Sequence, residues 1–247
     1  MEHKTWKRIV PGSETAFLFL HGILGTPAHF KDLIALVPEN CSVCAPLLPG
    51  HGGSTRDFSK SSMAEWKEAA EESVADLARA HKRVYIVAHS MGTLFAIRQA
   101  VEKPQLVRGL FLLAAPLRLS LKAGMLENMA KLYGGRVAED DLPAVAARDA
   151  CSVALTKNIF AYLGWIPRYL ELFGEIRAVR KIAGTIQIPT EVFQSAGDEL
   201  VSSGAAAYFP PAVRCHVLPH SRHYYYDSRD YKVLLEAFGS CVERWRQ

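Results

Sequence analysis

Short apolar runs recur along the chain and predict the strands of a buried sheet. Aliphatic, β-branched and aromatic residues fill these runs with little alternation of polar and apolar positions, which is typical of strands covered on both faces. The runs span residues 16–20, 42–48, 84–87, 109–116, 190–195 and 215–218. Strands of this kind predict a mostly parallel sheet that carries helices on both of its faces.

Amphipathic helical patterns separate the apolar runs. One begins at Pro27, and a longer one runs from Ser62, a capping residue with Glu65 three positions later, to about His81. Another helix follows the third strand, and a terminal helix begins near Tyr231. Alternating strands and helices predict an α/β fold, in which ligands bind at the carboxyl ends of the parallel strands.

The alternation is interrupted between residues 117 and 188. Helical segments in this region are separated by glycines and prolines, and the region is too long for a simple sheet crossover. We therefore expect one α/β domain over residues 1–247, with residues 117–188 inserted as a helical lid between core strands. One amphipathic stripe of the lid consists of Leu121, Met125, Met129 and Leu132.

Composition and charge narrow the classes of function. The chain has 247 residues, of which 49% are hydrophobic, enough for one sizeable core. Its formal net charge of +4 is spread along the sequence, so we expect no nucleic-acid partner. The N-terminus has no signal-peptide core and no apolar run approaches membrane-spanning length, so we expect no stable membrane insertion.

The five cysteines indicate neither a disulfide framework nor a metal site. Cys151, Cys215 and Cys241 are scattered. Cys41 and Cys44 have a C-x-x-C spacing, but no second pair and no histidine cluster completes a redox or metal site. We expect buried, reduced thiols, no bound metal and a cytoplasmic protein.

The most informative stretch is Tyr85–Thr93, where a predicted strand passes directly into a helix. Ser90 occupies the turn, which lifts its hydroxyl above the edge of the sheet. Strand and helix approach closely there, so the residues two positions before and after the serine, Ala88 and Gly92, must be small. The stretch resembles the G-x-S-x-G nucleophile elbow of the α/β-hydrolases, although Ala88 replaces the first glycine. A Ser-x-Gly turn alone is also typical of an ordinary turn.

Two loops upstream extend this resemblance. Residues 21–23, His-Gly-Ile, resemble the family's loop after an early strand, which implies that the amides of Ile23 and Met91 form an oxyanion hole. A plain strand-loop-helix connection is the alternative. Residues 49–54, Pro-Gly-His-Gly-Gly-Ser, resemble a loop of monoacylglycerol-lipase-like and carboxylesterase-like hydrolases. The resemblance implies that His51 braces this loop and is not the catalytic base.

A serine nucleophile needs a neutral imidazole to accept its proton and a carboxylate to orient that imidazole. Asp198 follows the predicted strand after the lid, and His223 follows the last predicted strand. The order Ser90, Asp198, His223 is the order found in α/β-hydrolases. Their surroundings resemble the Gly-x-Asp loop of the family and the Ser-x-His segment of bacterial carboxylesterases.

Other residues compete for these two roles. Glu199, Asp227 and Asp230 are alternative acids, and His220 is the alternative base. Asp227 is expected to cap or solvate the terminal helix instead. Some family members carry the acid after the sixth strand, but residues 115–118 contain none here.

The resemblance implies a serine carboxylesterase similar to bacterial carboxylesterases and monoacylglycerol lipases. Ser90 attacks a carboxylic ester, His223 takes its proton, Asp198 orients the imidazole, and water hydrolyses the acyl-enzyme without a cofactor. The expected substrate is a small-molecule ester of short- to medium-chain acids or a monoacylglycerol. Cleavage of a thioester, an amide or a carbon–carbon bond and a non-catalytic binding protein stay open as alternative functions. The sequence also leaves open the length of the acyl chain and the oligomeric state. Candidate acyl-chain contacts, for which ordinary packing is the alternative, are Phe160, Tyr162, Leu163 and Trp165.

Overall fold

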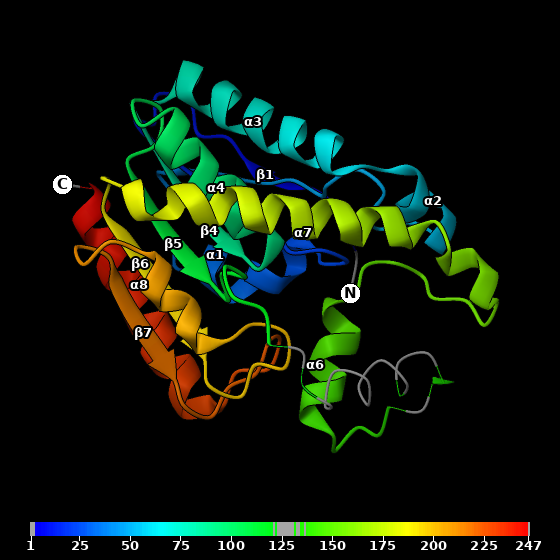
Figure 1. The fold of residues 1–247 in the computed structure, drawn as a ribbon. Coiled ribbons are helices and arrows are strands. Elements are labelled where there is room, and N and C mark those ends of the chain that lie inside the picture. Colours follow the sequence, from blue (N-terminus) through cyan, green and yellow to red (C-terminus); the bar gives the residue numbers. More distant parts are fainter. Residues whose placement is uncertain (1–2, 121, 123–130, 132–133, 136, 247) are drawn as a thin grey trace.

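A seven-stranded sheet forms the centre of the molecule (Figure 1). The structure, a computed structural model, describes residues 3–120, 122, 131, 134–135 and 137–246. The strands are β1 (Trp6–Arg8), β2 (Thr15–Leu20), β3 (Ser42–Ala45), β4 (Arg83–His89), β5 (Gly109–Leu113), β6 (Thr190–Ser195) and β7 (Arg214–Leu218). Their order is β1-β3-β2-β4-β5-β6-β7. Only β1 pairs antiparallel within this described sheet, and the mostly parallel α/β architecture predicted from the sequence is confirmed.

Every predicted apolar run contributes a strand, although two strands end earlier than expected. β3 ends at Ala45, because Pro46 has no N–H to donate to a neighbouring strand. β5 ends at Leu113, where Ala114 turns the chain with φ +50°. The sequence does not predict β1, because its three residues are polar or exposed and carry no apolar run.

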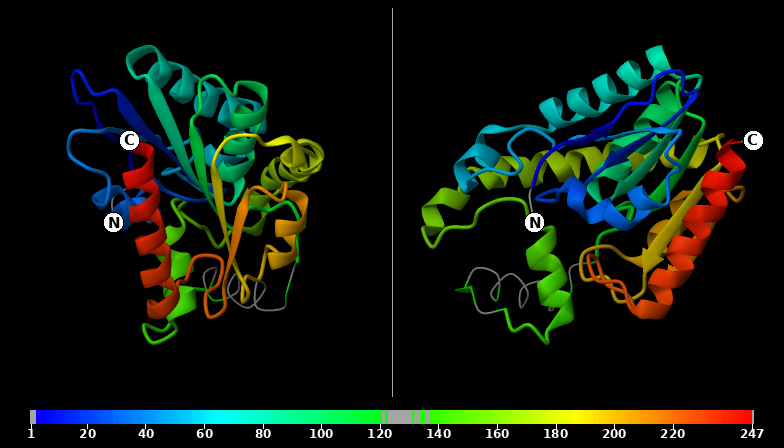
Figure 2. Two further views of the ribbon diagram at one scale, coloured as in Figure 1. Left: turned by 90° about the vertical axis from the view of Figure 1, so that its left-hand side faces the viewer. Right: turned by 180° about the vertical axis from the view of Figure 1, so that it is seen from behind.

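Helices cover both faces of the sheet (Figure 2). The helices, with η marking 3₁₀ helices, are η1 (Pro27–Phe30), α1 (Lys31–Ala35), α2 (Thr55–Lys60), α3 (Met63–Ala80), α4 (Met91–Glu102), α6 (Leu142–Ala150), η2 (Ile159–Tyr162), α7 (Trp165–Ile182), η3 (Ala183–Thr185), η4 (Ser203–Tyr208) and α8 (Ser228–Arg246). Helices α1 and α8 lie on one face, and α3, α4 and α7 lie on the other.

Alternation along the central strands divides the core between the two faces. In β2, Phe17 and Phe19 pack with Phe238 of α8, whereas Leu18 and Leu20 belong to the core that contains Trp66 of α3. Successive side chains of a strand point to opposite faces, so an entirely apolar strand supplies both cores. This double coverage explains why the strands show no polar alternation.

The helix boundaries follow capping signals in the sequence. As predicted, α3 begins directly after Ser62, whose hydroxyl accepts the amide N–H of Glu65 at 3.2 Å. The short helix α2 is not predicted, although Ser54 and Asp57 form a capping box at its start. The terminal helix α8 begins at Ser228, three residues before the predicted start.

The region between β5 and β6 contains α6, η2, α7 and η3. Helix α7 lies alongside α4 (Figure 1), and its buried residues Leu172, Ile176 and Val179 belong to the main core. Helix α6 lies beyond the carboxyl ends of the strands (Figure 1). The predicted stripe of Leu121, Met125, Met129 and Leu132 lies outside the described residues. The role of residues 117–188 as a lid stays a prediction.

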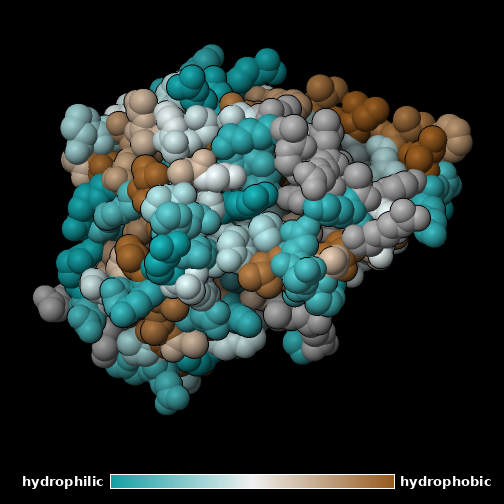
Figure 3. All heavy atoms as spheres, turned by 90° about the horizontal axis from the view of Figure 1, so that it is seen from below, coloured by the Kyte–Doolittle hydropathy of each residue, from teal (hydrophilic) through white to brown (hydrophobic). Residues whose placement is uncertain are grey.

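The candidate acyl-chain contacts separate into buried and outward-facing side chains. Trp165 is buried, its ring packs against Phe58, and its Nε1–H donates to the Thr55 carbonyl at 3.0 Å. Phe160 and Leu163 are 72% and 61% exposed. Apolar side chains gather at one end of the molecule in the view from below (Figure 3). Local packing therefore accounts for Trp165, while Phe160 and Leu163 face outward.

Candidate active site

Ser90 sits on a sharp turn between β4 and α4. Its backbone has φ 52° and ψ −122°, a conformation that is strained for a residue with a Cβ. A Cβ on Gly92 would overlap the Leu20 carbonyl, and one on Gly22 would lie 2.9 Å from the Ser90 Cβ. Glycines at these positions therefore let α4 and the loop after β2 approach the turn. The predicted strand-to-helix elbow is present at Ser90.

The structure brings Ser90, His223 and Asp198 into one hydrogen-bonded chain. The Nε2 atom of His223 lies 3.1 Å from the Ser90 Oγ, and its Nδ1 lies 2.8 Å from the Asp198 Oδ2. Since an ionised carboxylate only accepts, Nδ1 carries the proton and Nε2 is free to accept from the serine hydroxyl. Ser90 is 7% exposed, and the other two residues are 1% exposed each.

The surroundings of Asp198 stabilise its negative charge. Its Oδ1 accepts the amide N–H groups of Leu200 and Val201, each at 2.8 Å. Its Oδ2 remains for His223, so both carboxylate oxygens are satisfied. Burial lowers the pKa of His223, but the charge and hydrogen bond of Asp198, with the charge of Glu199, outweigh burial. The pKa of His223 is therefore raised above its ordinary value of 6.5.

The rival acids accept hydrogen bonds from groups other than the His223 ring, and it is the ring of His223, not that of His220, that lies beside the Ser90 hydroxyl. Glu199 Oε2 accepts the backbone N–H of His223 at 3.4 Å. Asp230 accepts the amide of His220 and the hydroxyl of Ser221. Asp227 accepts the Arg229 amide at the start of α8, which confirms the expectation that it caps the helix.

The loop after β2 forms a tight turn beside Ser90. The Gly25 N–H donates to the Gly22 carbonyl at 3.0 Å, which closes the turn around Ile23 and Leu24. Leu24 has φ 58°, so its backbone is held in the left-handed region. The amide of Ile23 takes no part in the closing bond. Met91 is the first residue of α4, where amides have no intrahelical acceptor.

Two neutral histidines hold this turn in place. His51 Nε2 accepts the Leu24 N–H at 3.1 Å, and its Nδ1–H donates to the Pro49 carbonyl. His21 Nδ1–H donates to the Gly22 carbonyl of the turn at 2.8 Å, while its Nε2 accepts the Leu48 N–H at 3.0 Å. Burial lowers the pKa of His51 to about 4 and that of His21 well below 6.5. The bond to Pro49 lies within the 49–54 loop that the resemblance expects His51 to brace, and the bond to Leu24 ties that loop to the turn after β2. His51 must be neutral to accept the Leu24 N–H.

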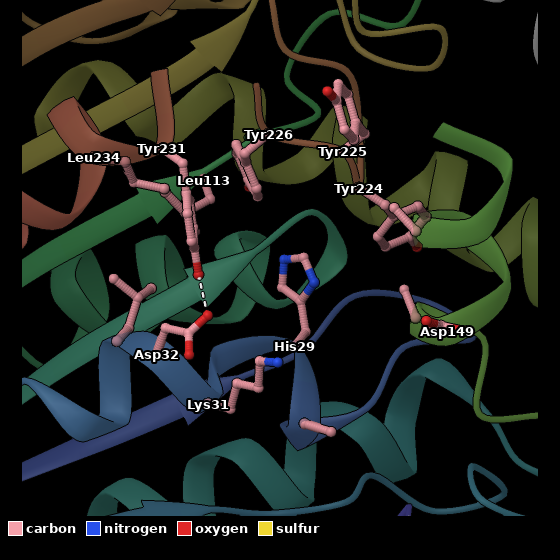
Figure 4. Close-up of a pocket in the computed structure, with 14 residues that line it drawn as sticks. His29, Lys31, Asp32, Leu113, Asp149, Tyr224, Tyr225, Tyr226, Tyr231 and Leu234 are labelled. Atoms are coloured by element: carbon pink, nitrogen blue, oxygen red, sulfur yellow. Dashed lines mark hydrogen bonds between the residues drawn. The ribbon is translucent and has the colours of Figure 1, made fainter. Parts of the chain in front are cut away.

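A pocket of about 280 Å³ is lined by residues of η1, α1, α6 and the segment from Tyr224 to Leu234 (Figure 4). The ring of His29 stands in the pocket, and across it the Tyr231 hydroxyl donates to Asp32 at 2.7 Å. Ser90 does not line the pocket. The ring of Tyr224, whose centroid lies 4.7 Å from that of His223, connects the pocket to the candidate site.

Within residues 3–120, 122, 131, 134–135 and 137–246, no group of three or more His, Cys, Asp or Glu side chains is arranged to hold a metal ion. Cys44, Cys151, Cys215 and Cys241 are free thiols, and Cys41, Cys44 and Cys241 are buried. No helix among these residues has the length and apolarity required to span a membrane.

The side chains that hold the backbone of His223 are not predictable from the sequence pattern. Glu199 binds its N–H, and His89 Nε2 lies 2.9 Å from its carbonyl oxygen. His89 directly precedes the serine within the predicted elbow, but the pattern carries no signal for a contact with a residue 134 positions away.

Relatives of the chain match parts of its sequence. An uncharacterized protein of Mycobacterium tuberculosis is 34% identical over 108 residues, which cover 43% of this chain and 30% of that protein. A thermostable monoacylglycerol lipase of a Bacillus species is 28% identical over 90 residues, 36% of each protein. The matches therefore span about a third of the length of these curated relatives.

Solved structures resemble the whole fold. A metagenome-derived lipolytic enzyme has a TM-score of 0.73 at 18% identity, covering 98% of both chains. The monoacylglycerol lipase of Paleococcus ferrophilus has a TM-score of 0.69 at 17% identity, covering 98% of this chain and 99% of its own. At such identities the likeness concerns the fold.

The broadest match is to a family model. The model of the alpha/beta hydrolase family matches residues 17–237, from the first buried strand into the terminal helix, and this span contains Ser90, Asp198 and His223. The match covers most of the chain and agrees with the strand order and the elbow. The chain belongs to the alpha/beta hydrolase family.

Proposed function

We propose that the protein is a serine hydrolase that cleaves carboxylic esters through an acyl-enzyme. Ser90 is the nucleophile, His223 the general base and Asp198 the residue that orients and stabilises the imidazole. The observation that carries the proposal is the His223 ring, which bridges the serine hydroxyl and the buried carboxylate at 3.1 and 2.8 Å.

In the first half of the reaction, the Ser90 oxygen attacks the ester carbonyl while His223 Nε2 takes the hydroxyl proton. The amides of Ile23 and Met91 donate to the resulting oxyanion, the role that preorganised backbone N–H groups have in acyl transfer. Collapse of the tetrahedral intermediate expels the alcohol, which receives the proton from His223.

In the second half, His223 takes a proton from water, and the hydroxide equivalent attacks the acyl-serine. A second tetrahedral intermediate collapses, the carboxylic acid leaves, and Ser90 recovers its proton. The Asp198 carboxylate raises the pKa of His223 and so stabilises the imidazolium that forms in both halves of the reaction.

The substrate is a small-molecule ester of a short- to medium-chain acid or a monoacylglycerol. This assignment rests on the similarity to the Bacillus monoacylglycerol lipase and to the lipolytic fold neighbours. The buried free thiols of Cys44 and Cys241 suit a reducing compartment such as the cytoplasm.

The experiment is hydrolysis of p-nitrophenyl esters of graded acyl length by the wild type and by Ser90→Ala. Loss of the nucleophile is expected to lower kcat by roughly 10⁴-fold or more. A thioester and an anilide of the same acyl group test the alternative acyl transfers. Unchanged turnover in Ser90→Ala would remove Ser90 from its role, and a folded wild type inactive on all three classes would favour a binding protein.

A further inference from the structure

Both backbone polar groups of His223 are held by side chains. Its N–H donates to Glu199 Oε2 at 3.4 Å, and its carbonyl oxygen lies 2.9 Å from His89 Nε2. His223 lies in the loop between β7 and α8 and belongs to neither element. A strand residue is held by backbone hydrogen bonds to neighbouring strands, whereas the backbone position of His223 depends on these two side-chain bonds.

The His89 contact has only one chemical interpretation. A carbonyl oxygen can only accept, so Nε2 of His89 carries a proton and donates it. Burial lowers the pKa of His89 well below 6.5, as do the nearby charges of His29 and His223. His89 is therefore a neutral imidazole with its proton on Nε2 at neutral pH.

The surroundings of His89 fix the plane of its ring. The ring centroids of His29 and His223 lie 4.4 and 4.9 Å from its own, and that of Tyr224 lies 5.2 Å away. A Cβ on Gly22 would lie 3.3 Å from the Nδ1 atom of His89. The loop after β2 therefore packs against the Nδ1 edge of the His89 ring. The titratable groups facing His89 are His29, His223, Tyr224 and His21.

We propose that His89 is a positioning residue that holds His223 in register with Ser90 through the hydrogen bond from its Nε2–H to the His223 carbonyl. His89 is the last residue of β4 and directly precedes Ser90. The rigid strand that presents the nucleophile therefore also fixes the backbone of the base. This role rests on the proposed function, since it concerns the geometry of the proton transfer from Ser90.

The test compares two substitutions of different chemistry. His89→Phe keeps a ring in the cavity and removes the donor, whereas His89→Gln places an amide N–H near the former Nε2. A displacement of about 1 Å at a reacting group can cost roughly 10²-fold in rate. We expect His89→Phe to lower kcat for a p-nitrophenyl ester by about 10- to 100-fold with KM unchanged, and His89→Gln to restore most of kcat.

Two further measurements separate positioning from general damage. Thermal unfolding and circular dichroism establish that both variants are folded under the assay conditions. Long-range ¹H–¹⁵N spectra of the wild type report which nitrogen of His89 carries the proton, and they do so without turnover. We expect the Nε2–H tautomer.

The outcomes are distinct. Equal kcat values for wild type and folded His89→Phe, or equal losses in both variants, would overturn the positioning role and leave the proposed function intact. The Nδ1–H tautomer would also overturn it. An inactive wild type would refute the proposed function and the positioning role together, while the spectra would still decide whether the hydrogen bond exists.

Discussion

Acid should destabilise the protein through His51, and the size of the effect follows from its contacts. His51 accepts the Leu24 N–H at Nε2, so the folded state needs the neutral ring. Burial lowers its pKa from 6.5 to about 4. The unfolded chain takes up a proton near pH 6.5, whereas the folded chain resists protonation until about pH 4. Falling pH therefore favours unfolding across this interval.

For a single group with these two pKa values, the free energy of unfolding falls by about 2 kcal/mol between pH 7.5 and pH 5. The buried neutral histidines His21, His29 and His89 act in the same direction, so the wild type loses more in total. A paired variant isolates the contribution of His51.

His51→Gln is the matched variant, because its side-chain oxygen can accept the Leu24 N–H and does not titrate between these pH values. Urea unfolding of both proteins at pH 7.5 and pH 5 gives two pH-dependent losses. We predict that the loss in His51→Gln is smaller by about 2 kcal/mol. Equal losses in the two proteins would refute the neutral-acceptor role of His51.

Three further predictions concern the triad, the elbow and the outward-facing apolar residues. Asp198→Asn should lower kcat by roughly 10⁴-fold. It also removes the charge that raises the pKa of His223, so the acidic limb of the kcat/KM pH–rate profile should move to lower pH, and an unmoved limb would contradict this. Gly92→Ala should lower the free energy of unfolding, measured in urea, by about 1–3 kcal/mol or more. The control Gly174→Ala lies in helix α7 with open space around it and should be neutral or stabilising, so equal effects of the two variants would contradict the packing at the elbow. Phe160→Ser should change KM for p-nitrophenyl butyrate by less than about twofold, and a large rise in KM would place this exposed ring against the acyl chain.

The sequence predicts those features that depend on local pattern. Entirely apolar strands such as β2 and β4 stand out because both faces are buried, and the order of Ser90, Asp198 and His223 follows from the strands that precede them. The elbow is also local, since the small residue at position 92 is required within two positions of the serine.

Features that depend on distant contacts carry no such pattern. β1 is a strand because it pairs antiparallel with β3, which lies far away in the sequence. The bond from His89 to His223 joins residues 134 positions apart, and no periodicity relates them. Helix α2 is a different case, because the Ser54–Asp57 capping box at its start is a local signal in the sequence. Its six residues, however, are too few to give a clear helical stripe.

The central claim is that Ser90 is an activated nucleophile, and covalent labelling tests it most directly. A fluorophosphonate probe reacts with a serine whose hydroxyl proton is taken by a neighbouring base. The measurement is the intact mass after incubation, followed by peptide mapping, for the wild type and Ser90→Ala. The account predicts one adduct on Ser90 in the wild type and none in the variant; a folded wild type without an adduct, or an adduct on another serine, would contradict it.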